Sequence, residues 1–111
     1  MEKNGKGRTY RLISAIYKLC REGEWRVKFT KLRKDVGVID PERKIIYIDP
    51  WKEETLSTFM HECMHVIFGN RKEREVIRLE NMLMENISRT QAQRLMLAMA
   101  EMMVKIKTKS S

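Results

Sequence analysis

A pair of histidines one helical turn apart is the part of the sequence best suited to chemistry. The segment His61-Glu62-Cys63-Met64-His65 has the form H-E-x-x-H. Residues four apart in a helix lie on the same face, so both imidazoles can reach one metal ion, which we expect to be zinc. Glu62 is rotated by about 100° from His61 around the helix axis. This rotation puts its carboxylate beside the metal as a general base rather than as a ligand.

His61 and His65 are the only histidines in the 111-residue chain. A random arrangement of this composition would produce the pattern in roughly 1 of 500 sequences. The alternative interpretation is a helix with two surface histidines and a solvated glutamate. We expect the metal site, because the motif also lies inside a segment with helical periodicity.

The residues before the motif predict one helix and a small sheet. Apolar residues recur every three or four positions between Arg8 and Glu22, as in an amphipathic helix. Apolar and polar residues then alternate over 25–29, which is typical of a half-buried strand. Two further strands, 36–39 and 44–48, flank the turn residues of 40–43 and should form a hairpin. We therefore expect a three-stranded antiparallel or mixed sheet.

Helical periodicity continues from the motif toward the C-terminus. We expect helices over 53–68 and 72–87, separated by Gly69 and Asn70, and a last helix that begins at Ser88 or Thr90 and runs to about Ile106. The order of helix, sheet and three helices predicts an α+β fold. The length suits a single domain over residues 1–111, with frayed ends at 1–7 and 107–111.

Composition narrows the class of protein further. The chain is 42% hydrophobic and 34% charged, which is typical of a globular domain and excludes disorder of the whole chain. No apolar run is long enough to span a membrane, and the charged N-terminus lacks the apolar region of a signal peptide. Cys20 and Cys63 belong to no metal-binding or disulfide pattern. We therefore expect a cytoplasmic protein.

The motif and the strand before it resemble the core of the zincin metallopeptidases. The similarity covers about Val36 to Ile87 and is closest to small glutamate-liganded zincins (gluzincins) of the ImmA/IrrE-like and phage-encoded kind. The resemblance implies a minimal zincin fold with one zinc ion per chain. It also implies a third zinc ligand from a glutamate on the helix after the motif, and a peptide substrate added as a strand along Lys44–Ile48.

The helix expected over 72–87 carries four candidates for that ligand, which are Glu73, Glu75, Glu80 and Glu85. Around the helix axis, Glu80 lies about 40° and Glu73 about 60° from Val76, the centre of the apolar face. Glu75 lies about 100° from it, and Glu85 points away. Glu73 is nearest the tight turn back to His65, and 73–76 resembles the family's E-x-x-A/S signature except for its last residue. Glu73 is the expected ligand, with Glu80 and Glu75 as alternatives.

The resemblance implies hydrolysis of peptide bonds by a zinc-activated water, with Glu62 as the general base. Tyr47, Arg71 and Arg74 are candidates for stabilising the oxyanion. Two other functions remain open. The net charge of +8 favours anionic partners, so the same centre could serve a nuclease or another nucleic-acid-associated hydrolase. Zinc could also stabilise a non-catalytic binding protein. The oligomeric state is left open.

Overall fold

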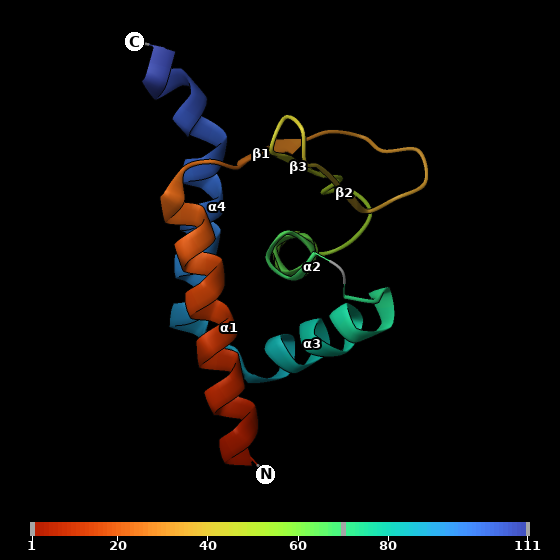
Figure 1. The fold of residues 1–111 in the computed structure, drawn as a ribbon, viewed down its shortest axis with the longest axis vertical. Helices are drawn as coiled ribbons and strands as arrows, with labels where there is room; N and C mark the ends of the chain where they lie inside the picture. The colour runs from red at the N-terminus through yellow and green to blue at the C-terminus, as the bar shows by residue number, and fades with distance from the viewer. Residues whose placement is uncertain (1, 70, 111) are drawn as a thin grey trace.

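The computed structural model describes the backbone of residues 2–69 and 71–110 and the side chains of 7–69 and 71–103. Over these residues it confirms the expected α+β fold, with an N-terminal helix, a three-stranded mixed sheet and three further helices (Figure 1). The elements are α1 (Glu2–Glu22), β1 (Arg26–Phe29), β2 (Gly37–Asp40), β3 (Ile45–Ile48), α2 (Thr55–Phe68), α3 (Glu73–Asn86) and α4 (Arg89–Ser110).

The central strand of the sheet is β3, which pairs in parallel with β1 and antiparallel with β2. The expected β2–β3 hairpin is therefore confirmed. Its turn is closed by Asp40 Oδ1, which accepts the backbone N–H groups of Glu42 at 3.1 Å and Arg43 at 3.2 Å. The prediction that Lys44–Ile48 adds a substrate strand is wrong, because both edges of β3 already bind neighbouring strands.

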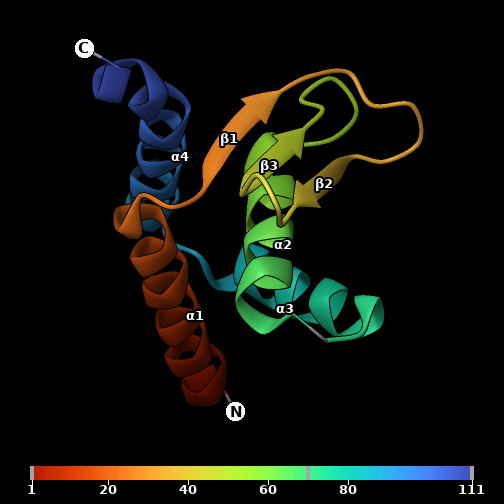
Figure 2. The ribbon, with the colours of Figure 1, turned by 45° about the horizontal axis from the view of Figure 1, so that its top comes forward.

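The two outer strands differ in what covers them. β1 lies against α4 (Figure 2). β2 pairs with β3 along one edge, and its other edge has no strand partner among the described residues. The free edge of the sheet is therefore that of β2.

The motif helix α2 is the most enclosed element of the fold. It packs against β2 and β3 on one side and against α3 on the other, while α1 and α4 lie side by side at its flank (Figure 1). Phe59, Met60, Cys63 and Met64 of this helix are completely buried. Burial of such side chains stabilises the folded state by about 1.5–3 kcal/mol each, so the position of α2 is strongly fixed.

Two helix ends follow the expected signals. Gly69 ends α2 with a positive φ of 63°, and its N–H donates to the carbonyl of His65 at 2.9 Å. The second expected breaker, Asn70, lies outside the described residues. Ser88 rather than Thr90 caps α4, because its hydroxyl accepts the N–H of Gln91 at 3.0 Å and its own N–H donates to the side chain of Gln91 at 2.9 Å.

The outer helices are longer than expected. α1 begins at Glu2 and α4 continues to Ser110, so the described backbone is helical at 2–7 and 107–110, where frayed ends were expected. Apolar periodicity reports only the part of a helix that carries an apolar face, so it gives no sign of polar helical ends such as these. Within the described residues, no helix is long and apolar enough to cross a membrane. Cys20 and Cys63 are buried and form no disulfide.

Asp49 connects the end of β3 to the long loop before β2. Its side chain is 2% exposed. Oδ2 accepts the N–H of Leu32 at 2.9 Å, and Oδ1 accepts the N–H of Trp51 at 3.1 Å. The hydrogen bond from Leu32, aided by that from Trp51, lowers the pKa of Asp49. Lys52 Nζ, 3.9 Å from this carboxylate, also donates to the carbonyl of Leu32. The loop is thus attached to the sheet at several points.

We expect Asp49→Asn to lower the midpoint of thermal unfolding at pH 7. The native pKa of Asp49 lies below that of the unfolded chain, so its carboxylate stabilises the fold above the unfolded value of about 3.9. This contribution is lost as the pH falls through the native pKa, and the difference between variant and wild type should shrink there. Circular dichroism melts across this range test it. Glu42→Gln, in the exposed β2–β3 turn, is the control; a difference independent of pH would contradict the prediction.

Candidate metal centre

His61 and His65 lie on the same face of α2, one turn apart. Their Nε2 atoms are 3.2 Å apart, and the two rings meet edge to face. Buried side chains of α2 itself fix the position of the backbone that carries both imidazoles. Two nitrogens facing each other at this distance form a site suited to a cation, because both lone pairs can be directed to the same point.

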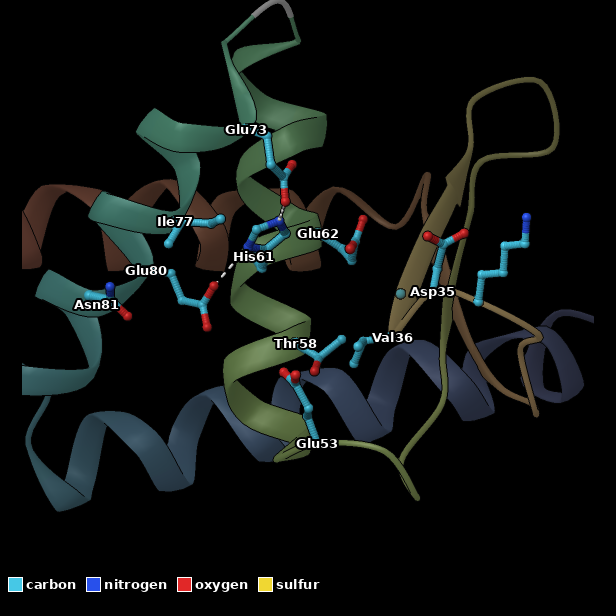
Figure 3. A pocket seen from close by; sticks show the side chains of 12 residues that line it. Asp35, Val36, Glu53, Thr58, His61, Glu62, Glu73, Ile77, Glu80 and Asn81 are labelled. Carbon is cyan, nitrogen blue, oxygen red and sulfur yellow. Dashed lines mark hydrogen bonds and ion pairs between the residues drawn. The ribbon is translucent and has the colours of Figure 1, made fainter.

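Glu73, the first residue of α3, brings a carboxylate to the same point. Its Oε1 is 2.7 Å from Nε2 of His65. Its Oε2 is 2.9 Å from Nε2 of His61, and Figure 3 shows these last two side chains together. One ligand atom from each of the three residues lies within 4.8 Å of the others. Ligand atoms around a tetrahedral zinc ion are separated by about 3.3 Å, given bond lengths of about 2.0–2.1 Å. Two histidines and a glutamate therefore fit zinc in number, chemistry and spacing.

Glu80 contacts His61 through the other ring nitrogen. Its Oε1 is 2.7 Å from Nδ1 of His61, and Ser57 Oγ donates to its Oε2. The hydrogen bond with Glu80 raises the pKa of His61. Burial alone would raise the pKa of Glu80, but the hydrogen bonds from His61 and Ser57 outweigh burial and lower it. An ionised Glu80 keeps a proton on Nδ1 of His61 and leaves Nε2 free to bind a metal.

The candidate glutamates of α3 thus occupy different places. Glu73 joins the two Nε2 atoms, and Glu80 orients one of the rings. Glu75, the third alternative, makes no hydrogen bond or ion pair with either histidine within the described part of the chain. Helical angles placed Glu73 and Glu80 on the side of α3 that faces the histidines, but they did not show which of the two reaches both Nε2 atoms.

Glu62 lies beside the histidines and is 7% exposed. Burial raises the pKa of its carboxyl group, and the charges of the neighbouring histidines only partly oppose this. Among the described residues it has no hydrogen-bond or ion-pair partner. Gly37 approaches it so closely that a Cβ added to Gly37 would lie 2.8 Å from both Cγ and Oε2 of Glu62. The start of β2 can therefore cover Glu62 only because residue 37 has no side chain.

A cleft of about 450 Å³ opens over these residues. α2 forms its floor, α3 forms one wall, and the segment that leads into β2 forms the other (Figure 3). Its lining consists of Lys34, Asp35, Val36, Gly37, Glu53, Thr58, His61, Glu62, Glu73, Ile77, Glu80 and Asn81.

Sequence reasoning missed the wall formed by residues 34–37, because the position of β2 over the motif depends on the order of the strands. A glycine at the start of an apolar strand was the one available sign of a close approach. The expected oxyanion candidates Tyr47, Arg71 and Arg74 are not among the residues that line the cleft. Arg71 instead packs over the ring of Phe68, with its guanidinium carbon 4.9 Å from the ring centre.

Comparison with known proteins provides no independent assignment: no family model, curated protein or solved structure matches the chain.

We expect the purified protein to bind one zinc ion per chain, and His61→Ala or Glu73→Ala to abolish stoichiometric binding. Glu80→Gln should weaken zinc binding by about 10- to 100-fold without abolishing it, because it affects only the orientation of His61. Mass spectrometry of metal content and competition with a chromogenic chelator measure both effects. Glu75→Ala, an exposed change on the same helix, should retain wild-type affinity. Unchanged affinity in Glu73→Ala would refute the ligand set.

Proposed function

We propose that the protein is a zinc-dependent metallopeptidase. The observation that carries the proposal is the convergence of His61 Nε2, His65 Nε2 and the carboxylate of Glu73 next to the buried carboxyl group of Glu62. Of these four residues, His61, Glu62 and Glu73 line an open cleft, as a site that receives a substrate requires. The resemblance of the H-E-x-x-H segment to zincins agrees with the same activity.

Zinc, when bound, would polarise the scissile carbonyl and lower the pKa of a water molecule. The role of Glu62 follows from its position on the cleft floor: it accepts a proton from the attacking water and delivers it to the leaving amine as the C–N bond breaks. Burial raises the pKa of Glu62. A raised pKa suits a carboxylate that must first accept a proton from water and then release it near neutral pH. His61 and His65 act as neutral ligands, and Glu80 maintains the necessary protonation state of His61.

The substrate backbone has a suitable partner in β2. The outer edge of this strand has no partner in the described structure, and Val36 and Gly37 at its start line the cleft. An extended peptide bound to this edge would pass over the α2 face that carries His61 and Glu62. We propose this edge as the place where the substrate strand is added.

The lining of the cleft argues against a nucleic-acid substrate. It contains five carboxylates and a single basic side chain, that of Lys34. A phosphodiester backbone would be repelled by this surface, despite the overall charge of +8. The peptidase is therefore preferred over the nuclease. A purely structural zinc site would also leave unexplained the carboxyl group of Glu62, which faces the cleft without a protein partner in the described structure.

We expect Glu62→Gln to retain zinc and to lower peptide hydrolysis by at least about 100-fold, since the amide cannot accept the proton from water. Cleavage of casein and of a quenched peptide library, measured with metal content on the same preparation, tests this. The matched change Glu85→Gln, on the exposed surface of α3, should leave hydrolysis unchanged. Hydrolysis at the wild-type rate in Glu62→Gln would exclude the proposed role.

We expect Gly37→Ala to lower hydrolysis while zinc binding is retained. The new methyl group would overlap Cγ and Oε2 of Glu62 and displace the carboxylate, whereas none of the three ligands is touched. The readouts are hydrolysis and zinc affinity, together with a thermal melt. Gly7→Ala is the matched control, because a Cβ there meets no atom within 4 Å. A wild-type rate in Gly37→Ala would mean that the contact between β2 and Glu62 does not position the base.

A further inference from the structure

The charge of the cleft is opposite to that of the whole chain. The protein has 23 basic and 15 acidic residues. The cleft is lined by five acidic residues, which are Asp35, Glu53, Glu62, Glu73 and Glu80, and by one basic residue, Lys34. A third of all the acidic side chains therefore gathers at one site. A concave site focuses such a charge and raises the local concentration of cationic groups.

The proposed chemistry uses only three of these carboxylates. Glu62 is the base, Glu73 is a ligand, and Glu80 orients His61. Asp35 and Glu53 remain; both side chains are exposed, and neither has a hydrogen bond or ion pair within the described part of the chain. They come from two separate elements, the segment before β2 and the residues before α2, yet both face the same cleft (Figure 3).

The position of Glu62 is a second observation that indicates a ligand at this place. The residue is more than nine-tenths buried and faces into the cleft without a protein partner. A divalent cation at His61, His65 and Glu73, together with Lys34, would neutralise three of the five negative charges. The cleft would therefore stay negative even with its metal bound.

We infer that the site selects peptides with a lysine or arginine side chain near the scissile bond, and that Asp35 and Glu53 bind this side chain. The inference rests on the proposed peptidase function. A long cationic side chain can lie along the cleft with its charge between the two exposed carboxylates and its methylene groups against Val36, which separates them (Figure 3). The rest of the molecule repels a basic peptide, so attraction has to arise in the cleft itself.

The test measures binding separately from cleavage. Zinc-loaded Glu62→Gln protein is titrated with two fluorescein-labelled alanine-based peptides, one with a central Lys-Arg pair and one with a central Glu-Glu pair, and fluorescence anisotropy is recorded. We expect the basic peptide to bind at least about tenfold more tightly at low salt. Adding Asp35→Asn and Glu53→Gln should reduce this preference to less than about threefold.

A control variant separates the local site from long-range charge. Glu42→Gln with Glu85→Gln removes the same number of charges from exposed positions outside the cleft and should keep the preference. Equal binding of the two peptides would overturn the inference. Loss of the preference to the same extent in the control, or its full retention in the cleft variant, would overturn the assignment to Asp35 and Glu53.

Cleavage of the same two peptides by the wild-type protein distinguishes this inference from the proposed function. Selective binding without cleavage would contradict the peptidase and leave the recognition of basic side chains supported. Cleavage of both peptides at equal rates, with equal affinities, would support the peptidase and contradict the selectivity.

Discussion

The contact between His61 and Glu80 is a polar link between the two helices of the candidate metal centre. It joins the floor of the cleft to its wall, because one partner belongs to α2 and the other to α3. Val76, Leu79 and Leu83 bury the apolar face of α3 and fix its position. Apolar packing alone does not determine how the His61 ring is rotated or which of its nitrogens carries the proton. The 2.7 Å contact with Glu80 defines both. With α3 in this position, its first residue carries a carboxylate to both histidines.

The sheet contributes to the site by covering it rather than by supplying ligands. β2 lies over Glu62, and Gly37 makes the approach possible. The loop before β2 is attached to the buried carboxylate of Asp49 and to the side chain of Lys52. The burial that raises the pKa of Glu62 therefore depends on a chain of contacts that begins at the end of β3, outside the cleft. The candidate site on these two helices is thus covered by a loop that lies far from them in the sequence but beside them in the fold.

The sequence predicted those features that depend on local pattern. Periodicity located the helices, and the H-E-x-x-H spacing put His61 and His65 on one face, as the structure confirms. Helical angles favoured Glu73 and Glu80 together, but the roles of the two depend on how Gly69 ends α2 and where α3 then begins. Strand alternation revealed three strands without their order, since neighbours in a sheet are chosen by nonlocal packing. The wall formed by 34–37 was missed for this reason, whereas the substrate strand along Lys44–Ile48 had been expected from the resemblance to zincins and is excluded by the observed strand order.

The close spacing of the proposed ligands along the chain has a thermodynamic consequence. Glu73 follows His65 by only eight positions in the sequence. An ion held by these groups closes one short loop between two helices that already pack together, so it restricts the unfolded chain very little. Most of the core, including the sheet and the α1–α4 pair, lies outside that loop. The apoprotein should consequently remain a folded molecule with a largely prepared site, in which folding does not have to wait for the metal.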